Sequence, residues 1–331
     1  MKKKKIRHYS GIGGQAVLEG VMMRNKDMYA VAVRKPDGDI DVEVDEYHGV
    51  ASGTFFVKIP FIRGIFIFLD SLILGMKALN HSSTFYEEED DKPHKDNSIN
   101  TKATDSDSKE KLAMALTYAL SIVLAVGIFM VLPYFLSSIF ENYVRNASLL
   151  AIIEGVLRIL IFVIYILAIS QMQDIKRLFR YHGAEHKCIN CIERGRPLNV
   201  KNAMRSSRLH KRCGSSFVLF VMLVSIVLFF FIRTDSMILR VVYRILLIPV
   251  ISGISYELIR LAGRTDNIIV SILSAPGLWM QRLTTKEPDE EMIEVAIKSV
   301  EAVFDWKEYL KDTFGLEFEE EDYTSAYKED E

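Results

Sequence analysis

Several features are missing from this sequence of 331 residues. Charge of one sign is not in excess, since 41 basic side chains face 43 acidic ones, and this excludes a surface suited to general nucleic-acid binding. The basic start MKKKKIR is followed by HYSGIGG rather than by an apolar stretch, so we do not expect it to act as a cleaved signal peptide. No internal repeat is present.

Nucleotide-binding loops are missing as well. GIGGQA, residues 11–16, fits the loose pattern G-x-G-x-x-A, but that pattern needs a preceding apolar strand, and KKKKIRHYS stands there instead. The glycine-lysine pair of a phosphate loop is also absent. What remains is a glycine-rich stretch in which Gln15 and Glu19, four residues apart, would share one face of a helix. A solvated turn is the alternative.

Long apolar runs are what the sequence does have. Its mean hydropathy is positive although a quarter of its residues are charged, so apolar and charged residues lie in separate blocks, as in membrane proteins. Residues 112–140 carry no charge and exceed the roughly 20 residues that cross a bilayer. We predict further spans over 148–173, 215–232 and 237–259. The last contains three charged residues, so a buried or interfacial helix is the alternative there.

The distribution of basic residues predicts the topology. The segment 173–214 carries eleven lysines and arginines against three acids, and such loops stay in the cytoplasm. We therefore expect an inner-membrane protein of a bacterium with both termini cytoplasmic. All three cysteines, Cys188, Cys191 and Cys213, lie in this loop, where a reducing environment favours thiols or metal ligands over disulfides.

The segments outside the spans differ in character. Around Pro36-Asp37-Gly38, apolar and polar residues alternate, which predicts strand, turn and strand. Arg63, Asp70 and Lys77 are spaced seven apart on one narrow stripe, which predicts an amphipathic helix on or partly in the bilayer, with a fifth span as the alternative. A run rich in Asp, Glu, Lys and Ser follows, and it is too polar to bury a core.

The predicted fold is mainly α: a multi-pass α-helical membrane protein of about four spans with a small N-terminal cytoplasmic β-containing module. The predicted parts are a glycine-rich and β-hairpin module (1–58), an amphipathic or interfacial helix (59–85), a disordered acidic linker (86–111), a membrane domain (112–283) with a cytoplasmic His/Cys loop (174–214), and a C-terminal cytoplasmic helix with an acidic tail (284–331).

The stretch YHGAEHKCINC, residues 181–191, holds the strongest candidate chemistry. On a helix, His182 and His186 project to one side and could bind one cation, while Glu185 beside them would act as general base toward a bound water. This is the inverzincin arrangement H-x-x-E-H, and ordinary surface histidines are the alternative. We expect His210, Cys213 or Glu257 to complete the metal shell, although Glu257 could instead pair with Arg260.

Two further sets of residues attract attention. Cys188-x2-Cys191 together with His210-x2-Cys213 has the spacing of a structural zinc site, and it competes with the first set for His210 and Cys213. Within the apolar segments, Glu154 is expected to pair with Arg240 or Arg244, because unpaired charges at that depth are costly. If neither arginine serves, Arg158 is the next partner.

Five motifs, GGQAVLEGVMMR, AVAVRKPDGDI, YHGAEHKCIN, SRLHKRCGSSF and PGLWMQRLTTKEPDEEMIEVAI, resemble the YqhQ-like family of bacterial membrane proteins over nearly the whole chain. That family is described as predicted metal-dependent enzymes. Lys211 stands where its pattern usually has proline, and positions 188 and 191 are not fixed cysteines in it, which favours His182, His186, His210 and Cys213 as the metal set. The site residues that the resemblance implies are Gln15, Glu19, His182, Glu185, His186, His210, Cys213 and Gln281.

Three functions follow as hypotheses. The first is a metal-dependent hydrolase with a divalent cation, zinc by preference, acting on a membrane-embedded or membrane-proximal substrate. The second is a non-enzymatic membrane scaffold or assembly factor that binds a protein partner and uses a structural metal or polar clamp. The third is a transporter that uses Glu154 and the arginines. A catalytic metal keeps an open position and a structural one does not, so ligand count separates the first two.

Overall fold

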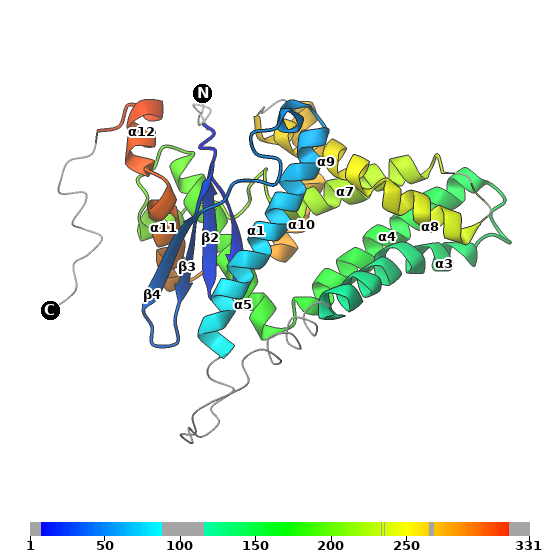
Figure 1. Ribbon diagram of the computed structural model, residues 1–331, viewed down its shortest axis with the longest axis horizontal. Coiled ribbons are helices and arrows are strands. Elements are labelled where there is room, and N and C mark those ends of the chain that lie inside the picture. The colour runs from blue at the N-terminus through cyan, green and yellow to red at the C-terminus, as the bar shows by residue number, and fades with distance from the viewer. Residues whose placement is uncertain (1–7, 88–115, 233, 235, 265–267, 318–331) are drawn as a thin grey trace, which may run out of the picture. The chain divides into compact units, whose positions relative to one another are not determined.

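The computed structural model describes residues 8–87, 116–264 and 268–317, apart from positions 233 and 235 (Figure 1). The chain forms two compact units. One is assembled from Met1–Glu88, Ala168–Phe220 and Ser252–Glu331, and the other from Glu89–Leu167 and Val221–Ile251. This differs from the division by sequence order, because the N-terminal module and the His/Cys loop belong to the same unit.

The first unit is built on a four-stranded antiparallel sheet in the order β1-β2-β3-β4. The hairpin predicted around Pro36-Asp37-Gly38 is present and joins β3 to β4. Gln15 and Glu19, in contrast, do not share a helix: Gln15 lies in β1, and Glu19 sits in the turn to β2 with a φ of 47°. The strands are β1 (Gly13–Val17), β2 (Gly20–Asn25), β3 (Met28–Arg34) and β4 (Ile40–Glu46).

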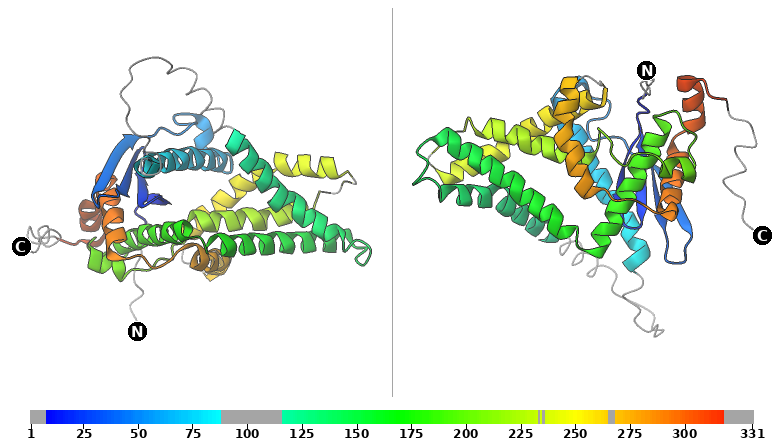
Figure 2. Two further views of the ribbon diagram at one scale, coloured as in Figure 1. Left: turned by 90° about the horizontal axis from the view of Figure 1, so that it is seen from below. Right: turned by 180° about the vertical axis from the view of Figure 1, so that it is seen from behind.

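Helices cover both faces of this sheet (Figures 1 and 2). α1 (Ile62–Glu87) lies on one face, and α5 (Gln173–Ile192) and α11 (Glu290–Val303) lie on the other. Because side chains alternate along a strand, Met22 packs toward Leu74 of α1 while its neighbour Met23 packs toward α5 and α11. Stretches that are distant in sequence therefore pack into two hydrophobic cores, one on each face of the sheet.

Two of the three residues in the polar stripe of α1, Arg63 and Asp70, are turned inward, whereas Lys77 is exposed. Asp70 is buried and accepts hydrogen bonds from the Tyr47 hydroxyl at 3.1 Å and the Val50 amide at 2.8 Å. Arg63 forms an ion pair with Glu257. The helix predicted over 59–85 thus exists, but it turns much of its polar stripe inward.

The apolar helices give two candidate spans, Leu116–Ser138 and Ser148–Ile169, or three if the bent pair Ile238–Leu246 and Ile248–Gly263 counts as one span. The pair is bent by 42°, and α7 (Gly214–Phe229) is a shorter apolar helix. The elements concerned are η2 (Gly127–Val131), a π-helical turn, α3 (Leu132–Ser138), α4 (Ala147–Ile169), α8 (Met237–Leu246) and α9 (Ile248–Arg264).

The second apolar segment and the helix that carries His182 are separate helices. α4 ends at Ile169, and Met172 is extended, with a ψ of 139°, before α5 begins. α5 is therefore a separate helix that belongs to the first unit. α10 (Ile268–Thr284), in contrast, runs unbroken through Pro276.

The remaining elements of the first unit are short. They are η1 (Phe55–Lys58), α6 (Val200–Met204) and α12 (Trp306–Phe314). The single helix expected within 284–331 is divided in two, since α11 ends at Val303 and α12 starts at Trp306. The predicted acidic linker and tail lie outside the described residues, except for the last residues of α1 and Glu317.

Candidate metal centre

α5 places three candidate side chains on one side. His182, Glu185 and His186 follow the spacing i, i+3 and i+4, which brings side chains together on a helix. Glu185 and His186 are buried, whereas the His182 side chain remains 19% exposed. His182 therefore marks the side from which the group meets solvent.

Gly183 allows a second backbone to approach α5. A Cβ at this position would lie only 2.0 Å from the carbonyl oxygen of Lys286. The Lys286 amide in turn donates to the Phe179 carbonyl at 2.8 Å. The chain that leaves α10 thus lies directly against α5, beside His182.

Backbone carbonyls orient both imidazoles. His182 Nδ1 lies 3.0 Å from the Thr284 carbonyl, and His186 Nδ1 lies 2.5 Å from the Arg208 carbonyl. A carbonyl only accepts, so each Nδ1 carries the proton, and in the neutral ring Nε2 carries the lone pair. Ligating histidines in metalloproteins are commonly fixed in this way.

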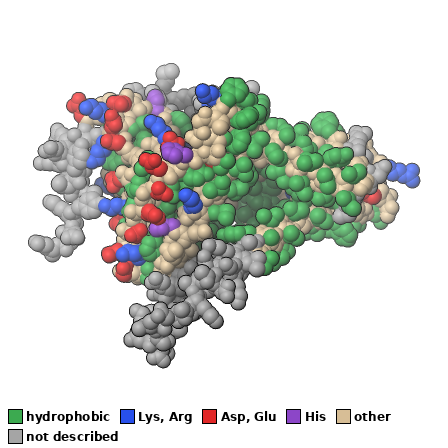
Figure 3. Space-filling model, in the orientation of Figure 1, with side chains coloured by type: hydrophobic (Ala, Val, Ile, Leu, Met, Phe, Trp, Pro, Cys, Tyr) green, Lys and Arg blue, Asp and Glu red, His purple; other side chains and the backbone are tan. Residues whose placement is uncertain are grey.

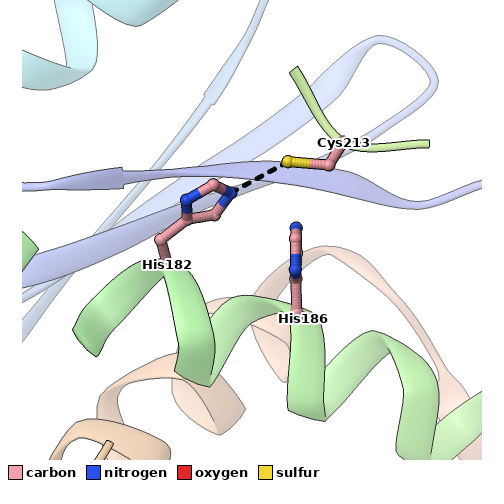
Figure 4. A group of neighbouring side chains, drawn as sticks. All are labelled: His182, His186 and Cys213. Atoms are coloured by element: carbon pink, nitrogen blue, oxygen red, sulfur yellow. Dashed lines mark hydrogen bonds between the residues drawn. The ribbon is translucent and has the colours of Figure 1, made fainter. Parts of the chain in front are cut away.

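Cys213 lies opposite the two rings. Figure 4 shows His182 and His186 projecting from α5 toward the Cys213 sulfur, which comes from the segment just before α7. Sγ is 3.1 Å from His182 Nε2, and the ligand atoms of all three residues lie within 4.8 Å of one another. In a tetrahedral zinc site, with bonds of about 2.0 Å to nitrogen and 2.3 Å to sulfur, such atoms are roughly 3.5 Å apart. A small movement of these side chains toward one another would let one cation contact all three. We call His182, His186 and Cys213 the metal-competent group.

Glu185 faces the same point. Its Oε2 is 3.9 Å from Nε2 of both His182 and His186. The carboxylate also accepts a hydrogen bond from the Gly14 amide of β1, and a Cβ on Gly14 would lie 3.0 Å from Glu185 Cγ. The glycine-rich stretch that resembled a nucleotide loop therefore packs against the metal-competent group.

The ionisation of the group is coupled. Burial opposes the thiolate of Cys213, but attraction to His182 and His186 outweighs it and holds the pKa of Cys213 well below its usual range. Burial likewise opposes the charged form of His182, but attraction to Cys213 raises the pKa of His182 to about 9. Burial raises the pKa of Glu185. Both shifts favour the charged forms, imidazolium for His182 and thiolate for Cys213.

The segment that carries Cys213 is clamped on two sides. Gln281 of α10 binds both backbone groups of His210, accepting from its amide at 2.8 Å and donating to its carbonyl at 2.6 Å. Lys187 and Asn190 of α5 hold the other side. They donate to the carbonyls of Met204, Ser206, Ser207 and Leu209.

His210 itself does not join the group of metal-competent atoms. Its Nε2 lies 3.3 Å from Glu193 Oε2, and Arg212 pairs with the same carboxylate. The His210 ring centroid is 5.8 Å from that of His186. Of the four residues that the family resemblance favoured, the structure brings together His182, His186 and Cys213, with His210 as a neighbour.

Glu257 also lies elsewhere. It receives two hydrogen bonds of 2.6 Å from Arg63, and Arg260 lies 3.8 Å away. The expected alternative partner, Arg260, is therefore close, but Arg63 makes the tighter contact. Nothing in the described part of the chain links Glu257 to the histidines.

The remaining polar residues implied by the resemblance hold β1 and its turn in place. Glu19 pairs with Arg177 of α5 and accepts a hydrogen bond from the Tyr181 hydroxyl at 3.3 Å. Gln15 points to the other face of the sheet, where its amide lies against Gly75 of α1. Both residues act on the strand that carries Gly14.

Cys188 and Cys191 lie in the helix α5, although both fall within the segment 174–214 that was expected to be a loop. Both side chains are buried in the core, where burial raises the pKa of each thiol. Cys191 Sγ contacts the Pro197 carbonyl at 3.4 Å. Within the described residues, neither cysteine shares a metal-competent group with His210 or Cys213.

In the second unit, Glu154 contacts two arginines. Arg244 Nη1 lies 2.6 Å and Arg158 Nη2 2.7 Å from its carboxylate, and all three side chains are buried. Arg240 instead donates to the Thr234 carbonyl at 2.7 Å. Glu154 thus pairs with Arg244, one of the two arginines expected, and with Arg158, the alternative partner.

Three contributors to the metal-competent group were missed by sequence reasoning: the carbonyls of Thr284 and Arg208 and the amide of Gly14. They are backbone groups, so no side-chain pattern signals them. The sequence signals them only through Gly14 and Gly183, where another segment of the same chain comes close.

Comparison with known proteins adds the family. The family described as "Protein of unknown function (DUF1385)" matches residues 59–306. The chain is 39% identical over 290 residues to "Uncharacterized protein YqhQ" of Bacillus subtilis (strain 168), which covers 87% of this chain and 90% of that protein. No solved structure matches. With its motifs and these matches taken together, the chain belongs to the DUF1385, or YqhQ-like, family.

Proposed function

We propose that this protein is a metal-dependent hydrolase of the membrane, with a centre formed by His182, His186 and Cys213. One observation carries the proposal: two imidazoles, each oriented by a backbone carbonyl, and one thiol converge so that their ligand atoms lie within 4.8 Å of one another. Three protein ligands leave a fourth position open, which is typical of catalytic rather than structural zinc sites.

The donor set favours zinc among the common divalent cations. Imidazole nitrogen and thiolate sulfur suit zinc, whereas magnesium and calcium prefer oxygen ligands. The attraction of His182 and His186 lowers the pKa of Cys213 and so favours its thiolate form. Binding therefore requires only that His182 release the proton on Nε2.

Glu185 is the proposed general base. A bound divalent cation would supply a Lewis acid and lower the pKa of a water molecule. Glu185, with Oε2 3.9 Å from both Nε2 atoms, stands where it could take a proton from that water and return it to a leaving group. The Gly14 amide holds the carboxylate in this orientation.

The proposed location is a bacterial inner membrane, with both termini cytoplasmic and the substrate in or beside the bilayer. Two or three helices of sufficient length and apolarity support this location. The excess of basic residues in the segment 173–214, which carries most of the centre, supports the cytoplasmic side.

Elemental analysis of the purified protein tests the proposal directly. We expect about one equivalent of zinc in the parent protein and none in His186→Ala. This variant lacks one of the three proposed ligands, the ring that the Arg208 carbonyl orients. His210→Ala is the matched control, since it removes a buried histidine of the same neighbourhood that lies outside the group. Equal metal content in the two variants would refute the proposal.

A second candidate, a cysteine-dependent hydrolase without metal, is favoured by the 3.1 Å contact between His182 Nε2 and Cys213 Sγ. A thiol held by a histidine, which is itself oriented by the Thr284 carbonyl, is an activated nucleophile. Alkylation by iodoacetamide separates the two candidates. Cys213 should react only after chelation if it binds metal, and at the same rate before and after chelation if it does not.

A further inference from the structure

Helix α1 carries an apolar stripe on its outward side. Its large hydrophobic side chains at intervals of three and four residues are between 40% and 49% exposed, and this spacing puts them on one face. Figure 3, in the orientation of Figure 1, shows hydrophobic side chains gathered over this part of α1 and charged ones over the neighbouring strands. We call this set the outer stripe: Leu69, Leu72, Ile73, Met76 and Leu79.

The exposure of the outer stripe is fixed by the opposite side of the helix. Asp70, Leu74, Ala78 and Ser82 are buried there. Asp70 accepts two hydrogen bonds from outside the helix, and Ser82 Oγ accepts one from the Leu18 amide at 3.3 Å. A rotation that buried the outer stripe would leave these buried polar groups unpaired, at a cost of about 1–3 kcal/mol each.

The segment before α1 exposes further large apolar side chains. Phe55, Phe56 and Phe61 are each more than half exposed. Lys58, between them, and Lys77, next to the stripe on α1, are exposed as well. Aromatic and aliphatic side chains flanked by lysines are the composition that binds the boundary of a bilayer with anionic headgroups.

The course of the chain also favours lipid over a protein partner. α1 ends at Glu87, and residues 88–115 lead to Leu116–Ser138, a helix long and apolar enough to cross a membrane. A surface one linker away from such a helix is within reach of the same bilayer. The outer stripe itself contains no charged residue, whereas the rims of protein interfaces are polar.

We infer that α1 is an interfacial helix, which docks the first unit on the bilayer with its outer stripe among the headgroups and upper acyl chains. Apolar faces of such helices enter about 5–10 Å deep. The inference does not depend on the metal centre. It does bring that centre close to lipid, because Gln15 contacts Gly75 of α1 and the adjacent Gly14 contacts Glu185.

Fluorescence quenching on the full chain in lipid nanodiscs tests the inference. The probe is bimane attached to Leu72→Cys, and the quenchers are a lipid with a doxyl group on its acyl chain and aqueous iodide, in phosphatidylcholine with phosphatidylglycerol. Val44→Cys on β4 is the matched control, because Val44 is 44% exposed and Leu72 is 49% exposed. Protein without an added cysteine gives the background from the buried native thiols.

We expect doxyl lipid to quench the label at position 72 at least threefold more strongly than the label at position 44, and iodide to show the opposite preference. Met76→Cys, one turn further along the outer stripe, should repeat the result at position 72. Equal iodide quenching at positions 72 and 44 would mean that the stripe faces water and would overturn the inference. Protection of position 72 from both quenchers would also overturn it, since protein would then cover the stripe.

Discussion

Glu185 is the residue on which the proposed chemistry depends most. Replacement by glutamine keeps the size of the side chain but removes its capacity to accept a proton. We expect Glu185→Gln to retain zinc, because the three ligand atoms come from other residues, and to lose about 10²- to 10⁴-fold in rate, the usual contribution of a general base. Hydrolysis of p-nitrophenyl acetate by the zinc-loaded protein is the measurement. A variant that keeps both metal and rate would show that Glu185 is not the base.

The proton on His182 predicts how metal affinity depends on pH. Since the pKa of His182 is raised to about 9, the ring must lose a proton to bind metal at neutral pH. Cys213, whose pKa lies well below its usual range, need not. Apparent zinc affinity should therefore rise about tenfold per pH unit up to about pH 9 and then level off. Competition with a chelator from pH 6 to 10 measures this.

Cys213→Ser provides the control for the pH prediction. It removes the anion that raises the pKa of His182, so the remaining, weaker affinity should level off at a lower pH. The same plateau in both proteins would contradict the assigned cause.

Gly183 should be intolerant of even a methyl group. In Gly183→Ala the new Cβ would meet the Lys286 carbonyl at 2.0 Å, and the backbone that orients His182 would have to move. Overpacking of this kind costs about 1–3 kcal/mol, so we expect lower thermal stability together with weaker zinc binding. Gly13→Ala, where a Cβ meets nothing within 4 Å, is the control, and equal losses in both variants would refute the packing argument.

At the scale of elements, helical periodicity was the most informative signal. The spacing of His182, Glu185 and His186 was enough to expect them on one side of a helix, and α5 has them so. The choice between His210 and Cys213 could not be made in advance. Both sit in an irregular segment whose course depends on hydrogen bonds from Gln281, far along the chain.

The same limit applies to α1 and α5, because sequence periodicity does not show which other segments pack against a helix. Seven-residue spacing correctly indicated a helix with a polar stripe, but only the fold shows that Asp70 of that stripe is needed inside, by Tyr47. The spacing of Cys188 and Cys191 matched that of a structural zinc site. In the structure they are small apolar side chains of the α5 core, because α11 and α6 pack over that end of the helix.

At the scale of the whole molecule, each of the two compact units is assembled from stretches that are separate in the sequence. The sheet of residues 13–46 receives α5 and α11 from far downstream, so a division by composition separates what the core joins. Composition did indicate the apolar helices, because a long uncharged run needs no tertiary information to be recognised. Packing between distant segments, in contrast, depends on the shapes of the side chains that meet, and periodicity does not reveal these contacts.

The charged cluster of the second unit allows the last prediction. Glu154 contacts Arg244 of α8 and Arg158 of its own helix, and all three are buried. Glu154→Arg would place three cations together, and loss of one partner from a buried pair alone costs about 3–5 kcal/mol. We therefore expect Glu154→Arg to lower the temperature at which the detergent-solubilised protein aggregates, as measured by size-exclusion chromatography after heating.

Exchange of the charges should distinguish between the arginines. Glu154→Arg with Arg244→Glu restores opposite charges at the 2.6 Å contact, so it should recover part of the lost stability. Glu154→Arg with Arg240→Glu is the matched control: Arg240 lies one turn away on α8, yet it contacts the Thr234 carbonyl and the Tyr134 ring rather than Glu154. Because charge pairing falls off with distance, the control pair should recover nothing, and equal rescue by both pairs would mean that net charge, not this contact, governs the stability of the apolar helices.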